Sequence, residues 1–109
     1  MKKVYYNKLI RDKIPEVIAQ KGGKYKTRAL LKKEFEKELK KKLVEESREL
    51  SEAPEGELVN ELSDVLEIVK SIALHHKINF KDVEKYQLKK RKERGGFTKR
   101  LFLIWSSGK

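Results

Sequence analysis

Cysteine is absent from this chain of 109 residues, which excludes disulfide bonds, thiolate metal ligands and a nucleophilic thiol. No apolar run reaches the ~18 residues that a membrane-spanning helix needs. The first residues, MKKVYYNKLIRDK, lack the apolar stretch and the small-residue cleavage site of a signal peptide. We therefore expect a cytoplasmic protein with no membrane association.

Hydrophobic residues are also scarce, at 38% of the chain. The length predicts a single domain over residues 1–109. A domain of this size buries only ~60–70% of its unfolded surface, so association with a second copy would add much burial. We expect a homodimer or a homotetramer.

Charge is abundant and unevenly distributed. Charged residues form 41% of the chain, and the net charge is +11. Residues 43–67 nevertheless hold nine acidic side chains and one basic one, Arg48. A nucleic-acid-binding protein would need only the basic part. An acidic centre within a basic chain suits a polyanion held through a metal ion, with carboxylates for the metal and lysine or arginine around it.

The hydrophobic pattern predicts a mainly α fold with a small β element. The two strongest helices are predicted over residues 34–53 and 57–76, and the short link between them predicts that they lie antiparallel. Asn79 is a candidate cap for a third helix that ends near Arg94. Weaker signals predict a short helix over 15–20, a strand or extended arm over 4–10, and strands over 25–31 and 97–105, the last paired with one of the other two.

Acidic residues fall on the apolar sides of both long helices. At ~100° per residue, Glu46 lies within the apolar arc of the first helix and Glu49 at its edge. In the second helix Glu61 lies inside the arc and Asp64 at its margin. Other nearby acids are predicted to face away from the seam: Glu45, Glu52, Glu55, Glu57 and Glu67.

Burying several carboxylates without a cation costs several kcal/mol, so something must compensate them. One interpretation is that Lys40, Lys42 or Arg48 folds inward, or that the carboxylates stay partly hydrated. The other is a metal ion. Hard oxygen ligands suit Mg²⁺, and Mn²⁺ is also possible. Two acidic pairs on consecutive helices favour the metal.

These residues resemble a known family. The segments KLVEESREL at 42–50 and ELSDVL at 61–66 look like the Glu-x-x-Glu and Glu-x-x-Asp signature of the all-α nucleotide pyrophosphohydrolases. That superfamily includes MazG proteins, dimeric dUTPases and phosphoribosyl-ATP pyrophosphohydrolase. The flanking segments NKLIRDKIP at 7–15 and RGGF at 94–97 resemble its small stand-alone members.

The resemblance implies a MazG-like antiparallel helical bundle, oligomeric, that hydrolyses a nucleotide between its α and β phosphates. The substrate would be a nucleoside triphosphate or a nucleotide like phosphoribosyl-ATP, and the products a monophosphate and pyrophosphate. Glu46, Glu49, Glu61 and Asp64 would be the Mg²⁺ ligands and catalytic residues, and Glu46 or Glu49 could instead orient the attacking water.

Substrate phosphates would then need basic partners. The candidates are Lys89, Lys90, Lys92 and Arg94 at the end of the third helix, beside Gly95-Gly96, and Lys8 and Arg11 in the N-terminal arm. A basic helix end is also ordinary solvated surface that suits a helix C-terminus. His75 and His76 are adjacent, which predicts that they point in different directions and serve the helix C-terminus rather than a metal.

Two other functions fit parts of the sequence. A basic helical module that binds nucleic acid without catalysis would account for the net charge but not for carboxylates aimed into a helix seam, so nucleic acid is the less favoured partner. A scaffold that kept the ligands and lost activity is the third. The intact set of four acids argues against it.

Overall fold

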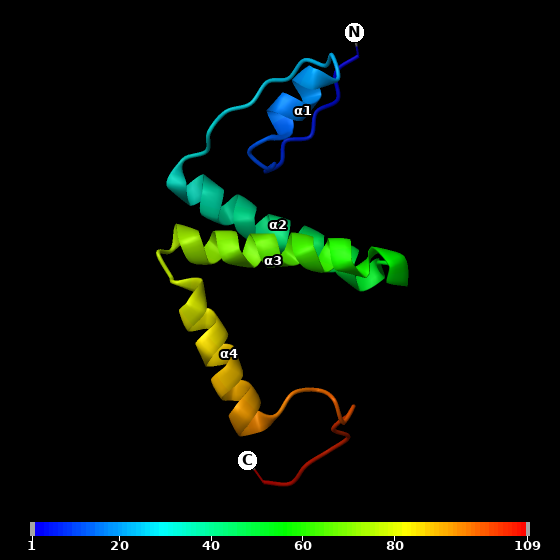
Figure 1. The fold of residues 1–109 in the computed structure, drawn as a ribbon, viewed down its shortest axis with the longest axis vertical. Coiled ribbons are helices and arrows are strands. Elements are labelled where there is room, and N and C mark those ends of the chain that lie inside the picture. Colours follow the sequence, from blue (N-terminus) through cyan, green and yellow to red (C-terminus); the bar gives the residue numbers. More distant parts are fainter. Residues whose placement is uncertain (1, 109) are drawn as a thin grey trace.

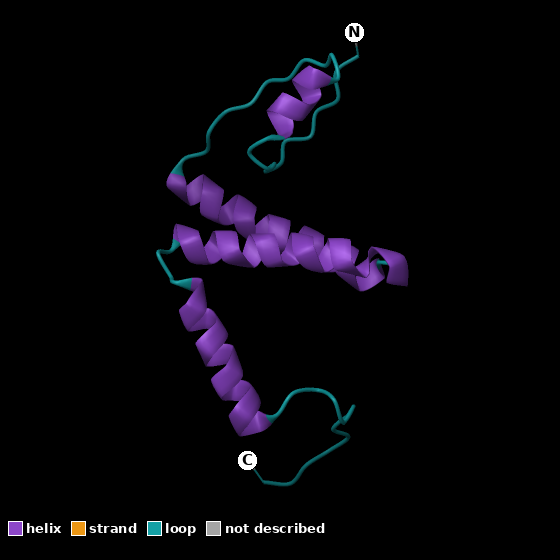
Figure 2. Cartoon of the chain, in the orientation of Figure 1, coloured by secondary structure: helices purple, strands orange, loops and turns teal. Residues whose placement is uncertain are grey.

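The computed structural model describes residues 2–108, and its regular structure is helical throughout. The α-helices are α1 (Ile14–Gln20), α2 (Lys32–Glu52), α3 (Leu58–His75) and α4 (Phe80–Arg94), with a 3₁₀ turn, η1 (Glu55–Glu57), between α2 and α3 (Figures 1 and 2). The mainly α fold predicted from the sequence is confirmed.

Helices α2 and α3 form an antiparallel hairpin and lie side by side along their length (Figure 1). Their apolar residues recur with the helical period and therefore face each other across one seam. Leu39 of α2 and Ala73 of α3 are the buried apolar residues of this seam. Pro54 and Gly56 lie in the link, where the first helix has to end. The predicted pairing of the two long helices is confirmed.

The start of α2 is fixed by a carboxylate. Glu34 accepts the backbone N–H of Leu31 at 3.2 Å and also binds the Arg28 guanidinium through both oxygens, at 3.2 and 2.8 Å. These bonds, with Arg28 as the larger cause, lower the pKa of Glu34 to about 2. They explain why α2 begins at Lys32, before the start at residue 34 that the sequence predicts.

Helix α4 begins and ends where its sequence predicts. The Asn79 side chain accepts the N–H of Lys81 at 3.0 Å, which satisfies one of the free amides of the first turn. At the other end Gly95 adopts a φ of 86°, a left-handed value that glycine adopts without steric cost. Its N–H donates to the carbonyl of Arg91 at 2.8 Å and closes the last turn.

The strands predicted over 25–31 and 97–105 are wrong, and residues 4–10 follow the alternative of an extended arm. None of these segments contains a strand in the described chain (Figure 2). Their aromatic and β-branched residues favour extended backbone, but a strand also needs a neighbouring strand to bond with. No such neighbour reaches 97–105, where Phe97 is 96% and Trp105 76% exposed. The small β element is therefore absent from residues 2–108.

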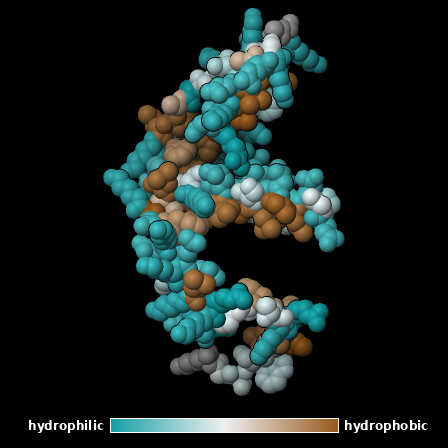
Figure 3. All heavy atoms as spheres, in the orientation of Figure 1, coloured by the Kyte–Doolittle hydropathy of each residue, from teal (hydrophilic) through white to brown (hydrophobic). Residues whose placement is uncertain are grey.

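The chain is open rather than compact. Its Cα radius of gyration is 18.9 Å, against ~13 Å for a compact domain of this length. Helix α4 leaves the His75 end of the hairpin and contacts no helix other than α3 (Figure 1). Hydrophobic side chains lie on the surface along the hairpin (Figure 3), among them Val59, Leu62 and Leu66 of α3. Within residues 2–108 no helix is long and apolar enough to cross a membrane.

Candidate metal centre

Three carboxylates meet between α2 and α3, toward the η1 end of the hairpin. Oxygens of Glu46, Glu61 and Asp64 all lie within 4.8 Å of one another. Glu46 is only 8% exposed, which makes it the one buried charged residue among those the structure describes. Glu61 and Asp64 are half-buried. The helical periods of the two helices thus bring together three of the four predicted acids on the predicted seam.

Two oxygens of this cluster lack partners. Glu46 Oε2 and Glu61 Oε2 are buried and have no hydrogen-bond partner in the described chain. A buried carboxylate oxygen without a hydrogen bond or cation costs several kcal/mol. The two orphaned oxygens lie in one cluster, so a single bound cation would compensate both.

The pKa of Glu46 also reflects a shortage of positive charge at the cluster. Burial raises the pKa of Glu46, and the neighbouring Glu49 carboxyl, with which it would share a proton, raises it further. Asp64 adds to this effect, while Lys42 opposes it. The pKa is raised because negative charge exceeds local positive charge, and a divalent cation would reverse that balance.

Basic side chains reach the cluster from two directions. Lys42, one turn before Glu46, places Nζ 3.6 Å from Glu46 Oε1, so the predicted inward lysine is present. Arg11 crosses from the N-terminal arm and donates to Asp64 Oδ1 at 2.8 Å. Neither contacts Glu61. The cations on the chain therefore compensate the cluster only in part.

Glu49 and Glu45 extend the acidic surface outward. Carboxylate oxygens of Glu45, Glu46 and Glu49 also lie within 4.8 Å of one another, with Glu49 exposed at the rim. Glu45 was predicted to face away from the seam, but it is half-buried and binds Lys42 at 3.7 Å and Lys8 at 3.8 Å. Its position one turn before Glu49 is the signal that could have placed it, because residues four apart share a helix face.

The donor set fits a hard divalent cation. Every candidate ligand is a carboxylate oxygen, which Mg²⁺ and Mn²⁺ prefer over softer donors. The cluster is open on the side of Glu49, so water or phosphate could complete the coordination. The residues present thus fit a hard divalent cation, which Glu46, Glu61 and Asp64 would hold, with Glu49 at the rim.

The basic residues of α4 lie elsewhere. Glu61 and Asp64 lie in the first part of α3, whereas α4 leaves its other end (Figure 1). The 15 residues of α4 extend ~22 Å further away. The chain therefore does not bring Lys89, Lys90, Lys92 or Arg94 to its own carboxylates, while it does bring Lys8 and Arg11.

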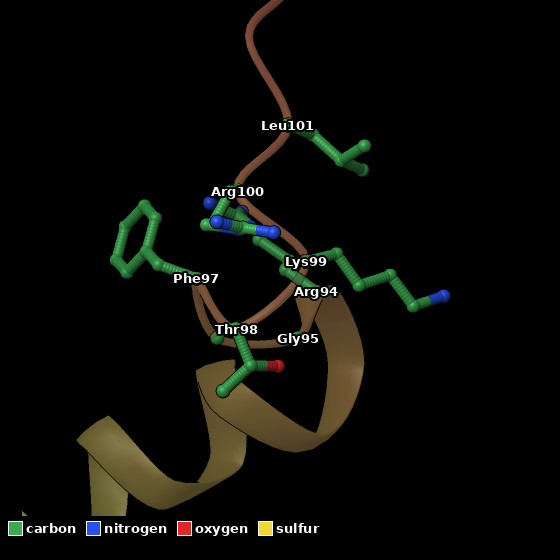
Figure 4. Close-up of a pocket in the computed structure, with 8 residues that line it drawn as sticks. Arg94, Gly95, Phe97, Thr98, Lys99, Arg100 and Leu101 are labelled. Carbon is green, nitrogen blue, oxygen red and sulfur yellow. The ribbon is translucent and has the colours of Figure 1, made fainter.

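The end of α4 forms a pocket of its own. The segment after Gly95 curls back over the helix end, so that Arg94, Lys99 and Arg100 supply cations around it and the Phe97 ring stands beside them (Figure 4). A second pocket along the same helix includes Lys90 and the ring of Tyr86. Lys99 and Arg100 were not among the predicted phosphate-binding residues. The two adjacent basic residues directly after Thr98 are the sequence signal that could have indicated them.

Comparisons with protein-family models, with curated proteins and with solved structures gave no match.

Proposed function

We propose that this chain is a Mg²⁺-dependent nucleotide pyrophosphohydrolase with a MazG-like arrangement of helices, working as a homodimer or homotetramer. The observation that carries the proposal is the carboxylate cluster of Glu46, Glu61 and Asp64, with two buried oxygens that lack any partner. An acidic cluster on a solvated helix face would not bury Glu46. A bound cation that neutralises these acids between the two helices would explain why they point inward.

The reaction requires water to attack the α-phosphorus while the bond to the bridging oxygen breaks and pyrophosphate leaves. When bound, Mg²⁺ supplies Lewis acidity that polarises phosphoryl oxygens and offsets charge on the leaving group. Glu49 is exposed at the rim and near Glu46, so its carboxylate is suited to orient the attacking water and accept its proton. The raised pKa of Glu46 means that cation binding displaces a proton and weakens as the pH falls.

Arg11 and Lys8 would hold the substrate phosphates on the chain's own side. Arg11 binds Asp64 through an exposed guanidinium, and Lys8 binds Glu45 at 3.8 Å. Once a divalent cation neutralises the acids, both side chains can turn to phosphate oxygens a few ångströms away. Arginine is well suited to this because its guanidinium can bind phosphate through two parallel hydrogen bonds.

The basic end of α4 would enter the site from a second copy. Helix α4 contacts α3 alone and leaves it at the end opposite Glu61 and Asp64, so its basic residues would not reach a nucleotide bound at the carboxylates of the same chain. The exposed apolar residues Val59, Leu62 and Leu66 on α3 provide a surface for association. Acidic residues on one chain and basic residues on another would then complete one nucleotide site.

Pyrophosphate release from a panel of nucleotides tests the proposal. The panel holds common and modified triphosphates, dUTP and phosphoribosyl-ATP, each with Mg²⁺ and with a chelator. We expect Mg²⁺-dependent release that is lost in Glu46→Gln and kept in the matched control Glu52→Gln, whose side chain is exposed on the same helix. Release that persists in Glu46→Gln or in chelator would reject the metal cluster as the catalytic centre.

A second candidate function is nucleic-acid binding without catalysis. The observation that favours it is the end of α4, where Arg94, Lys99 and Arg100 surround a pocket beside the exposed Phe97 ring. Cations beside an exposed aromatic ring are typical of single-strand binding surfaces. Salt-sensitive binding of RNA or DNA, together with no pyrophosphate release from any nucleotide, would favour this function over hydrolysis.

A further inference from the structure

A second group of metal-ligand side chains lies at the opposite end of the hairpin from the carboxylate cluster. His75 Nε2 lies 2.9 Å from Glu36 Oε1, which joins the end of α3 to the second turn of α2. Donor atoms of Glu36, His75 and His76 all lie within 4.8 Å of one another. The proposed hydrolase activity uses none of these three residues.

The end of α3 explains how adjacent histidines converge. Inside a helix neighbouring side chains diverge by ~100°, and the sequence therefore predicts that the two rings point apart. His75 is the last residue of α3, however, and His76 follows it as the C-cap with φ −90° and ψ 10°. Their ring centroids lie 5.1 Å apart with the ring planes at 79°. Because His76 lies beyond the last helical residue, its side chain does not follow the helical spacing.

Packing holds His75 in place. Its side chain is only 12% exposed, and the ring meets Phe35 edge-on at 5.1 Å between centroids. Phe35 and Glu36 are neighbours on α2, so one helix supplies both the apolar contact and the carboxylate. A fixed imidazole beside a carboxylate supplies two of the three ligands, and the third, His76, is exposed and lies within reach of both.

We propose that Glu36, His75 and His76 bind a borderline transition-metal ion such as Zn²⁺ or Ni²⁺, which ties the start of α2 to the corner between α3 and α4. Two imidazoles and a carboxylate prefer such ions over Mg²⁺, which selects oxygen donors. Donors in a tetrahedral zinc site lie ~3.4 Å apart. The donor atoms here lie within 4.8 Å of one another, with the His75–Glu36 pair at 2.9 Å, so small side-chain movements would bring them to that spacing. Water would take the fourth position.

The surroundings both favour and oppose a cation here. The carbonyl end of α3 carries partial negative charge, which attracts a cation to the last turn. The pKa of Glu36 is lowered, chiefly by its hydrogen bond with His75 and further by the charges of His76 and Lys32, so the carboxylate is available to a metal at neutral pH. Lys32, one turn before Glu36, is the competing cation.

The composition makes the test sharp, because the chain has no cysteine and these are its two histidines. Zn²⁺ binding to tag-free protein is measured by calorimetry in excess Mg²⁺, which occupies the carboxylate cluster. We expect one ion per chain, and a loss of affinity of at least about tenfold in His76→Gln and in Glu36→Gln. His76 is exposed, so its replacement leaves the hairpin folded.

The control is the double variant Glu46→Gln/Asp64→Asn, which removes the carboxylate cluster and should bind Zn²⁺ as the parent does. Shifts of the imidazole signals in nuclear magnetic resonance spectra on adding Zn²⁺ would support coordination by the rings. Unchanged affinity in His76→Gln, or binding lost in the carboxylate double variant, would overturn the proposal. So would the absence of Zn²⁺ binding by the parent protein, whether or not the chain releases pyrophosphate.

Discussion

Glu46 is a buried carboxylate whose negative charge opposes folding. It is 8% exposed, lies beside Glu61 and Asp64, and has Lys42 as its nearest cation at 3.6 Å. A carboxylate in this position works against folding whenever it is ionised and no metal is bound. Its position is therefore not explained by stability, and the proposed cation would account for it.

Replacing Glu46 with glutamine should therefore stabilise the metal-free protein. Because the folded-state pKa of Glu46 is raised, the parent loses stability as the pH rises through that pKa. We expect the free energy of unfolding of Glu46→Gln to exceed that of the parent by about 1 kcal/mol at neutral pH in chelator. The gain should vanish well below pH 4.5, the ordinary value for glutamate.

Urea denaturation at several pH values measures this difference, with Glu52→Gln, an exposed position of the same helix, as the control. In saturating Mg²⁺ the order should reverse, because only the parent binds the ion and gains stability from it. A glutamine variant that is less stable in chelator at neutral pH would show that Glu46 makes a favourable interaction in the metal-free state.

At the scale of the element, the N-terminal arm matters more than its lack of regular structure suggests. Arg11 reaches Asp64 across 53 residues of sequence, at 2.8 Å. This contact places the arm against the α2–α3 hairpin and supplies one positive charge to the carboxylate cluster. The arm therefore supports the cluster and would compete with any cation that binds there.

Arg11→Ala should raise the affinity of the cluster for Mg²⁺. Removing an exposed ion-pair partner leaves more negative charge for the incoming cation. The interaction energy of such a surface pair corresponds to an increase in Mg²⁺ affinity of about twofold to fivefold. Calorimetric titration with Mg²⁺ and no nucleotide measures the change. Lys13→Ala is the control, because it removes the same charge from an exposed position nearby.

The opposite result, a weaker Mg²⁺ affinity in Arg11→Ala, would mean that the arm holds the hairpin in its binding geometry. Pyrophosphate release should fall in Arg11→Ala whichever way the Mg²⁺ affinity moves, since the proposed function gives this guanidinium to the substrate phosphates. Measuring affinity and turnover separately distinguishes the two roles.

The features that follow from local sequence could be predicted, whereas contacts between residues far apart in the sequence could not. The helices, the Asn79 cap and the seam positions of Glu46 and Glu61 follow from helical period and capping chemistry. The Arg11–Asp64 pair could not be predicted, because no local pattern states where an irregular arm will lie. The strand predicted over 97–105 failed for the same reason, since extended propensity does not provide a partner strand.

At the scale of the whole molecule, the charge pattern and the open shape belong together. The acidic cluster lies toward one end of the hairpin, and the basic end of α4 points away from the other (Figure 1). Under the proposed function, one chain would present two halves of a nucleotide site that it does not assemble alone. Two chains could pair these halves reciprocally, as a two-fold symmetric interface requires.

Complementation between inactive variants tests this arrangement. Glu46→Gln and Arg94→Ala should each abolish or strongly reduce pyrophosphate release when alone. If one site draws on two chains, mixing them after unfolding and refolding together should restore about a quarter of parental activity per chain, because half of the dimers are mixed and each has one intact site.

Mixing either variant with itself is the control and should restore nothing. If the Glu46→Gln and Arg94→Ala mixture also stays inactive while mixed dimers are present by mass spectrometry, both residues serve the same chain's site. That outcome would require α4 to fold back on its own hairpin.

The small interior has a thermodynamic consequence. Leu39 and Ala73 are the only buried apolar residues among those described, which is too little to offset the conformational entropy of a chain this long. If the remaining burial comes from association, folding and assembly are one equilibrium, governed by mass action. The melting midpoint would then rise with the logarithm of total protein, and dilution would act as a denaturant.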